Sequence, residues 1–164
     1  MKNTKQIRQK VQNPKDPTVV VVDGSNIAHA ECTTEGCPKI FNIVSIFKLL
    51  KSKGYKPIVI VDAALRHQID DVDQYEALLR KRWIRQAPSR TVADYFILKT
   101  ADQKKADVIS NDTYNQYKNE FAWIDQRRQP FMIVEGEIML YDKALHEPGK
   151  RRKSAPRPPR KRVS

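Results

Sequence analysis

Short apolar runs alternate with amphipathic stretches along the middle of this chain. The first run, residues 18–22, is one threonine followed by four valines. A run without polar alternation is typical of a strand buried on both faces of a parallel sheet. Three later runs have the same character and predict strands at 57–61, 83–87 and 108–110.

The stretches between these strands carry apolar residues at the 3.6-residue period of a helix. The clearest helix starts at Pro38, places Ile40 and Ile43 on its apolar face, and ends at Gly54. Other helices are expected from Asp71 onward, over 92–105, and from Thr113 onward.

Two apolar segments near the end of this pattern predict a closing β-hairpin. They are residues 131–134 and 137–141, and Glu135-Gly136 lies between them. The order of elements therefore predicts an α/β fold: a three-layer α/β/α sandwich with a mainly parallel central sheet and a C-terminal β-hairpin. Right-handed crossovers place helices on both faces of such a sheet.

The two ends of the chain are polar and strongly basic. Residues 1–15 hold five Lys or Arg residues and no acid, and residues 150–164 hold eight and no acid. The middle of the chain keeps 18 basic and 19 acidic residues and is nearly neutral. We expect a disordered basic arm over 1–16, one folded domain over 17–149, and a disordered Pro/Arg-rich tail over 150–164.

This charge favours a polyanionic partner. Nothing apolar accompanies the basic ends, so nucleic acid is favoured and no membrane is expected as a partner. A solubility tail, or a tail that binds an acidic protein, is the alternative. The chain has no run of 18 apolar residues and no apolar N-terminal segment, so a cytoplasmic protein is expected. The candidate nucleic-acid contacts in the tail are Lys150, Arg151, Arg152, Lys153, Arg157, Arg160, Lys161 and Arg162.

Carboxylates follow all four predicted strands of the sheet, at the edge where open α/β sheets bind ligands. Asp23 and Asp62 follow the first and second strands, Asp94 begins the helix after the third, and Asp112 follows the fourth. Converging carboxylates repel one another unless a cation joins them, and ligand sets made only of oxygen favour Mg²⁺ or Mn²⁺. Such an ion activates water for phosphodiester hydrolysis.

Each of these acids also has a local structural interpretation. Asp23-Gly24 is a common turn, Asp94 can close a capping box with Thr91, and Asp112 can cap the next helix. Asp62 can be an ordinary loop acid. Their shared edge favours the joint functional interpretation, since four independent caps need not meet in one place.

Three segments resemble the motifs of NYN-domain ribonucleases of the Regnase (MCPIP) type, within the PIN-like superfamily. They are Val20–Ala28, Ala93–Lys99 and Asp107–Tyr114, and the first and third lie about 85 residues apart. The resemblance covers about residues 18–145 and implies a PIN-like fold. It also implies a metal-dependent endoribonuclease that hydrolyses RNA phosphodiester bonds through a metal-activated water, with Mg²⁺ (or Mn²⁺) as cofactor.

The resemblance assigns roles to particular residues. It implies that Asp23, Asn26, Asp94 and Asp112 are catalytic, that the three acids bind the metal, and that Asn26 orients a water or a phosphate oxygen. Further candidates at the strand ends are Ser25, Asp62 and Asn111. Candidate RNA contacts near the site are Arg90, Arg127 and Arg128, for which an ordinary solvated surface is the alternative.

Two departures from the Regnase pattern leave other functions open. Ala93 and Gln116 stand where those members have acids. They favour the alternative of a non-catalytic RNA-binding module on the PIN-like fold. A structure-specific DNA nuclease and a toxin of a toxin–antitoxin pair are further alternatives. The expected partner is RNA, single-stranded or in a stem-loop, and the oligomeric state stays open, with a homodimer among the options.

Five other side chains are of types that can bind a metal ion or stack on a base. His29, Cys32 and Cys37 form H-x₂-C-x₄-C, but a zinc site needs a fourth ligand, so reduced loop thiols are favoured. Trp83 and Trp123 are expected in the core, and stacking on bases is their functional alternative.

Overall fold

Five parallel strands form the centre of the computed structural model, which describes residues 16–88 and 91–141. The strands are β1 (Val19–Asp23), β2 (Lys56–Val61), β3 (Ile84–Gln86), β4 (Asp107–Ile109) and β5 (Arg128–Gln129), and their order in the sheet is β3-β2-β1-β4-β5. The predicted tail, most of the predicted arm and Arg90 lie outside the described residues.

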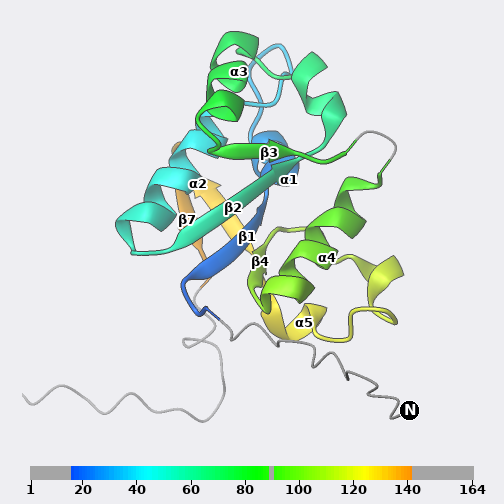
Figure 1. Ribbon diagram of the computed structural model, residues 1–164. Helices are drawn as coiled ribbons and strands as arrows, with labels where there is room; N and C mark the ends of the chain where they lie inside the picture. The colour runs from blue at the N-terminus through cyan, green and yellow to red at the C-terminus, as the bar shows by residue number, and fades with distance from the viewer. Residues whose placement is uncertain (1–15, 89–90, 142–164) are drawn as a thin grey trace, which may run out of the picture.

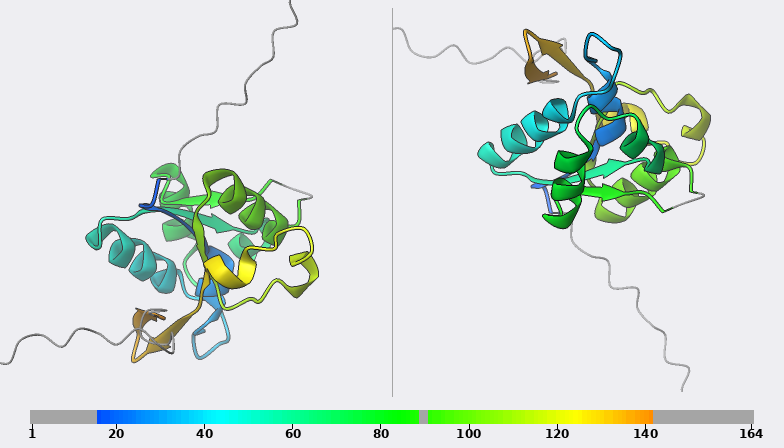
Figure 2. Two further views of the ribbon diagram at one scale, coloured as in Figure 1. Left: turned by 90° about the horizontal axis from the view of Figure 1, so that it is seen from below. Right: turned by 90° about the horizontal axis from the view of Figure 1, so that it is seen from above.

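Helices cover both faces of this sheet (Figures 1 and 2). They are α1 (Gly24–His29), α2 (Ile40–Ser52), α3 (Val72–Arg80), α4 (Ala93–Lys104) and α5 (Ile124–Arg127), with 3₁₀ turns at Ala63–His67 and Asn115–Tyr117. One core lies between α1, α2, α3 and the sheet, and a second lies between α4, α5 and the other face. The predicted three-layer α/β/α sandwich is confirmed.

The alternation of side chains along β1 explains why both faces carry a core. Val20 and Val22 join the first core, while Val21 joins the second. Successive side chains of a strand point to opposite faces, so an unbroken valine run suits a strand covered on both sides. Among the described residues, no helix is both long enough and apolar enough to cross a membrane.

Several elements differ from the sequence-based expectation. The chain enters α1 directly after β1, although no helix was predicted there, because six residues are too few to show a helical period. The helix expected from Pro38 begins at Ile40, with Lys39 at its N-cap. The helix expected from Thr113 is replaced by a 3₁₀ turn and the four-residue α5.

The closing hairpin lies beside α2 and completes the first core (Figure 1). Its strands are β6 (Phe131–Val134) and β7 (Glu137–Leu140), as predicted apart from one residue. Glu135 and Gly136 both have positive φ, at 51° and 79°. Two such residues give a type I′ turn, whose twist matches that of a two-stranded antiparallel ribbon.

Gly24 lets the first turn of α1 press against β2. A Cβ at this position would lie 2.7 Å from Val61 Cγ1, 2.8 Å from Val59 Cγ1 and 3.0 Å from the Ile60 carbonyl oxygen. Interiors are too closely packed to absorb such contacts without movement. Gly24 therefore fixes the distance between the end of β1 and the neighbouring strand.

We expect Gly24→Ala to destabilise the protein by about 1–3 kcal/mol, because the added methyl group overpacks the core against β2. Urea unfolding measures the change. Gly36→Ala is the control: Gly36 has a φ of +84° but open space around it, so it tests backbone strain alone. If Gly24→Ala lowers the free energy of unfolding no more than Gly36→Ala does, the close contact with β2 is contradicted.

Candidate active site

The strand order places a crevice at the carboxyl ends of β1 and β4. Chain connections run outward from β1 through β2 to β3, and then return to β4 and β5 on the other side. In open α/β sheets, ligands bind where the order reverses in this way. Asp23 ends β1, and Ser110, Asn111 and Asp112 follow β4, so the predicted carboxylates meet this crevice.

Asp23 is buried and held by three donors. Its exposed fraction is 5%. The Asn26 backbone N–H donates to Oδ1 at 3.0 Å, while the Ser110 and Tyr114 hydroxyls donate to Oδ2 at 3.0 and 2.7 Å. Burial raises the pKa of Asp23, these hydrogen bonds oppose the rise, and the charge of Asp112 adds to it.

Sequence reasoning missed Tyr114 and Ser110 as members of this site. Both are fully buried, and Tyr114 has a left-handed backbone conformation with φ of 49°. Such a φ is uncommon for an aromatic residue and marks a position fixed by its surroundings. Burial and the charge of Asp23 raise the pKa of Tyr114, which keeps its hydroxyl protonated as a donor. The Ser-Asn-Asp-Thr-Tyr motif contains both residues, but only its Asn111 and Asp112 were predicted as site residues.

Polar side chains tie the neighbouring loops to the end of β1. Ser25 Oγ accepts from the Asp62 N–H at 2.9 Å, which links α1 to the exit of β2. Asn26 Oδ1 accepts from the Asn111 N–H at 2.8 Å, which links α1 to the exit of β4. Asn111 Oδ1 in turn accepts from the Phe131 N–H at 3.0 Å. These candidates therefore hold the loops in register.

Asp94 is partly buried in the first turn of α4. The capping box with Thr91 does not form, because Val92 is the N-cap and makes no side-chain cap bond. Burial raises the pKa of Asp94 to about 6, with further contributions from the charges of Asp23, Asp112 and Asp62. The four predicted carboxylates therefore lie close enough at this edge of the sheet for the charges of the other three to act on Asp94.

Asp62 and Asp112 also satisfy local backbone groups. Asp62 Oδ1 accepts from the Leu65 N–H at 2.8 Å and caps a 3₁₀ turn. Asp112 Oδ1 accepts from the Tyr114 N–H at 2.8 Å, in the loop that positions the tyrosine hydroxyl. In each residue one carboxylate oxygen accepts this local hydrogen bond. A structural role in the loop is therefore compatible with a role in metal binding.

The described acidic side chains lie near one another but do not form a complete metal-binding site. Within residues 16–88 and 91–141, no three His, Cys, Asp or Glu side chains are arranged to hold one metal ion. The His29 ring has two hydrogen-bond partners: Nδ1 lies 2.8 Å from the Ser25 carbonyl oxygen, and Nε2 lies 3.1 Å from Gln68 Oε1. Cys32 and Cys37 are free thiols.

The two predicted arginine contacts have structural partners. Arg127 donates to the Ala101 and Ala106 carbonyls at 2.8 and 2.6 Å, which places it at the far end of α4 from Asp94. Arg128 donates to the Ser110 carbonyl at 3.0 Å and therefore lies near the crevice. A role in RNA contact remains a prediction for both.

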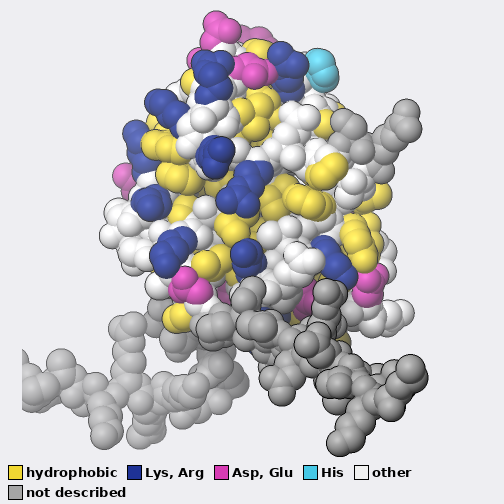
Figure 3. All heavy atoms as spheres, in the orientation of Figure 1, with side chains coloured by type: hydrophobic (Ala, Val, Ile, Leu, Met, Phe, Trp, Pro, Cys, Tyr) yellow, Lys and Arg dark blue, Asp and Glu magenta, His cyan; other side chains and the backbone are white. Residues whose placement is uncertain are grey.

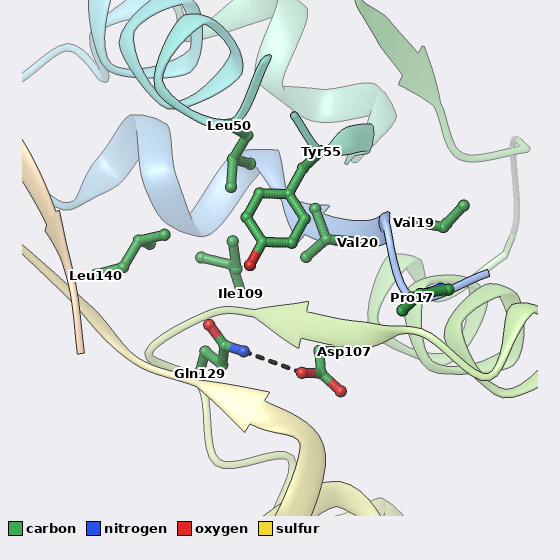
Figure 4. A pocket seen from close by; sticks show the side chains of 9 residues that line it. All are labelled: Pro17, Val19, Val20, Leu50, Tyr55, Asp107, Ile109, Gln129 and Leu140. Atoms are coloured by element: carbon green, nitrogen blue, oxygen red, sulfur yellow. Dashed lines mark hydrogen bonds between the residues drawn. The ribbon is translucent and has the colours of Figure 1, made fainter. Parts of the chain in front are cut away.

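A separate cavity of about 120 Å³ lies at the opposite edge of the sheet (Figure 4). It is lined mainly by apolar side chains of β1, β4 and the segments beside them, among them Val20, Tyr55 and Ile109. Its acid, Asp107, accepts a hydrogen bond from Gln129 at 2.9 Å. The cavity lacks the converging carboxylates of the crevice and is not part of the candidate site.

The fold is similar to that of two solved plant structures. One is the crystal structure of nuclear proteinaceous RNase P 2 (PRORP2) from A. thaliana, with a TM-score of 0.61 and 18% identity over 76% of this chain and 29% of that chain. The other, Arabidopsis thaliana nuclear protein-only RNase P 2 (PRORP2), has a TM-score of 0.60 and 17% identity over 77% of this chain and 30% of that chain. At such identities the likeness concerns the fold.

Sequence similarity identifies the family. The chain is 30% identical over 152 residues to Endoribonuclease rege-1 of Caenorhabditis elegans, covering 79% of this chain and 23% of that protein. It thus spans less than a quarter of this curated relative. The family model described as the Zc3h12a-like Ribonuclease NYN domain matches residues 16–154. That match covers most of the chain and confirms the resemblance found in the motifs: the protein belongs to the Zc3h12a-like ribonuclease NYN domain family.

Proposed function

We propose that this protein is a divalent-metal-dependent endoribonuclease whose site is the crevice at the ends of β1 and β4. The observation that carries the proposal is the buried carboxylate of Asp23, fixed by three donors beside Asp94 and Asp112. Membership of a ribonuclease family and the similarity to a protein named an endoribonuclease support it. RNA is the proposed substrate.

The donor set fits Mg²⁺ or Mn²⁺. The candidate ligands Asp23, Asp94 and Asp112 offer only oxygen, which suits a hard cation. Mg²⁺ is usually bound through one or two carboxylates and keeps several waters, so it does not need a complete protein cage. Burial raises the pKa of Asp94, and the charges of Asp23, Asp112 and Asp62 raise it further, so a cation among these acids would relieve their repulsion. When bound, the ion supplies a nucleophilic water and neutralises charge on the phosphoryl group.

The chain's own residues position the reaction. Tyr114 and Ser110 hold Asp23 Oδ2 in one orientation, so little rearrangement is needed when the cation and the RNA arrive. Asn26 and Asn111 fix the two loops that flank the crevice. No side chain of the described residues is required as a covalent nucleophile in this proposal. Water attacks the phosphorus in line, and the bond to the 3′-oxygen breaks, which leaves a 3′-hydroxyl and a 5′-phosphate.

A non-catalytic RNA-binding module is the second candidate. It is favoured by the two non-acidic positions, Ala93 and Gln116. Titration of Mg²⁺ and Mn²⁺ against labelled single-stranded RNA separates the two functions. Cleavage that depends on the ion supports the endoribonuclease, and RNA binding without cleavage at any ion concentration supports the module.

We expect Asp23→Asn to reduce cleavage by at least roughly 100-fold and to leave RNA binding intact, because it removes a proposed metal ligand. Gel assays of cleavage and binding measure the two effects. Asp73→Asn, at an exposed position in α3, is the control and retains activity. Unchanged cleavage by Asp23→Asn would exclude this crevice as the active site.

Tyr114→Phe tests whether Tyr114 positions Asp23. Loss of its 2.7 Å hydrogen bond frees the carboxylate to turn, so we expect metal affinity or activity to fall by about 10–100-fold. The Mg²⁺ concentration that gives half-maximal cleavage should rise, a change that a general folding defect does not produce. The exposed Tyr55 gives the control variant, Tyr55→Phe. An unchanged Mg²⁺ requirement would show that the hydroxyl is dispensable.

Asp94→Asn is expected to stabilise the metal-free protein while abolishing activity. A pKa of about 6 lies above the ordinary 3.8, so the folded protein prefers the protonated carboxyl, and the associated stability is lost as pH rises through about 6. In EDTA the variant should gain about 1 kcal/mol at pH 8, a figure discounted for partial exposure, and almost nothing at pH 4.

Thermal unfolding at the two pH values measures this difference. Asp73→Asn is a matched control, because Asp73 occupies the second position of α3 as Asp94 does in α4, and the two experience similar helix dipoles. An equal effect of Asp94→Asn at pH 4 and pH 8 would contradict the raised pKa.

A further inference from the structure

Aromatic and basic side chains form a shallow concavity between α2 and the start of β3. Its volume is about 470 Å³, and the lining residues are Phe47, Lys48, Lys51, Lys81, Arg82 and Trp83. We call these six residues the basic–aromatic groove. Four of them are cations with exposed positions, and the other two are half-buried rings. The predicted phosphate contacts included none of these four cations, and stacking on bases was only the alternative to core packing for Trp83.

The two rings form a flat stacked pair. Phe47 and Trp83 have their centroids 4.3 Å apart, with 12° between their planes. Both rings pack partly against the first core, and both also line the concavity. Lys81 Nζ lies 5.9 Å from the centroid of the Trp83 ring. A fixed, partly exposed ring flanked by cations is the arrangement on which nucleic-acid bases stack.

The surrounding charge is all of one sign. Residues 47–56 and 80–85 together hold eight basic residues and no acid, although residues 16–149 as a whole are nearly neutral. Lys56 forms an ion pair with Asp16 at 3.0 Å. Figure 3 shows Lys and Arg side chains across this side of the molecule with hydrophobic side chains exposed between them, while acidic side chains gather mainly towards the top and bottom of the view.

Helix ends explain only part of this arrangement. Lysines near the C-termini of α2 and α3 complement the helix dipoles, which accounts for Lys51 and Lys81. It does not account for the ring pair between them. It also does not account for Arg82, which has a left-handed φ of 58° where glycine is usual and so directs a cation to the rim at a cost in backbone strain.

The groove lies at the opposite edge of the sheet from the carboxylates. Trp83 directly precedes β3, whereas Asp62 directly follows β2, the neighbouring parallel strand. Ile84 is level with Val59 in this pair, so Trp83 lies about four residues, or roughly 13 Å of strand, before Asp62, and a ligand must span at least that length to reach both places. A polymer of phosphates and flat bases meets this requirement.

We propose that the basic–aromatic groove is an accessory binding site for single-stranded RNA, where a base stacks on Trp83 and phosphates contact Lys48, Lys51, Lys81 and Arg82. This rests on the proposed function for the identity of the polymer, but the groove does not take part in cleavage. The site would hold RNA segments remote from the cleaved bond and favour long substrates over short ones.

The first test measures RNA binding by the full chain in EDTA, where metal-dependent cleavage is absent. Lys51→Ser with Lys81→Ser is compared with a matched pair, Lys99→Ser with Lys104→Ser, from exposed positions of α4. For RNA of about twenty nucleotides, loss of two phosphate contacts should make the negative slope of log affinity against log salt shallower by about 1.4. It should also weaken binding about tenfold.

Substrate length separates the groove from the active site. RNA of about two nucleotides spans only about 7 Å when stacked and cannot reach both places. With Mg²⁺, the variant with Lys51→Ser and Lys81→Ser should cleave this short RNA at the wild-type rate. It should cleave the long RNA less efficiently than the wild type when the RNA concentration is limiting. If the variant with Lys51→Ser and Lys81→Ser binds the long RNA as tightly as the variant with Lys99→Ser and Lys104→Ser, the accessory site is excluded. If the wild type cleaves neither RNA, the proposed function fails, and the binding measurement still tests the groove.

Tryptophan fluorescence provides the second test. Stacking of a base should quench Trp83, and Trp83→Phe should remove that quenching while the ring pair with Phe47 is kept. Polyglutamate is the comparison ligand, because it offers charge without bases. Quenching by RNA but not by polyglutamate supports the site. Equal quenching by both would show a surface for acidic proteins and would overturn the assignment to RNA.

Discussion

The buried carboxylate of Asp23 is the constraint on which the site depends. A carboxylate taken out of water is costly unless its oxygens accept hydrogen bonds. Here three donors from two different segments meet that need: one from α1, and two from the loop after β4. The same bonds that make burial tolerable also bring the ends of β1 and β4 together. The crevice and the buried charge therefore form as one unit.

The packing around this carboxylate explains why the neighbouring residues are small or left-handed. Gly24 lies where β2 leaves no room for a side chain, so α1 starts immediately after the strand and its Asn26 N–H donates to Asp23. Tyr114 reaches Asp23 from the far side of the β4 loop, and it does so from a backbone conformation that a tyrosine rarely adopts. Backbone strain at Tyr114 is offset by the hydrogen bond that satisfies a buried charge.

The sequence predicted the layers of this fold better than the details of its site. Valine runs and helical periodicity depend on burial over many residues, so β1, α2 and α4 were predicted from pattern alone. Short elements such as α1 and β5 carry too few residues for any period. Tyr114 was missed because its role comes from a contact 91 positions along the chain with Asp23, and local spacing does not encode such a contact.

Net charge concealed a second feature of the molecule. The middle of the chain is nearly neutral, which suggested that basic residues outside the folded domain carry the affinity for RNA. The structure separates its charges in space: carboxylates gather at the carboxyl ends of the strands, and cations gather around Phe47 and Trp83 near the other edge. A site of negative charge repels phosphates until a cation is bound. A folded surface of opposite sign, kept about four strand residues away, can hold the polymer without neutralising the acids that the cation needs.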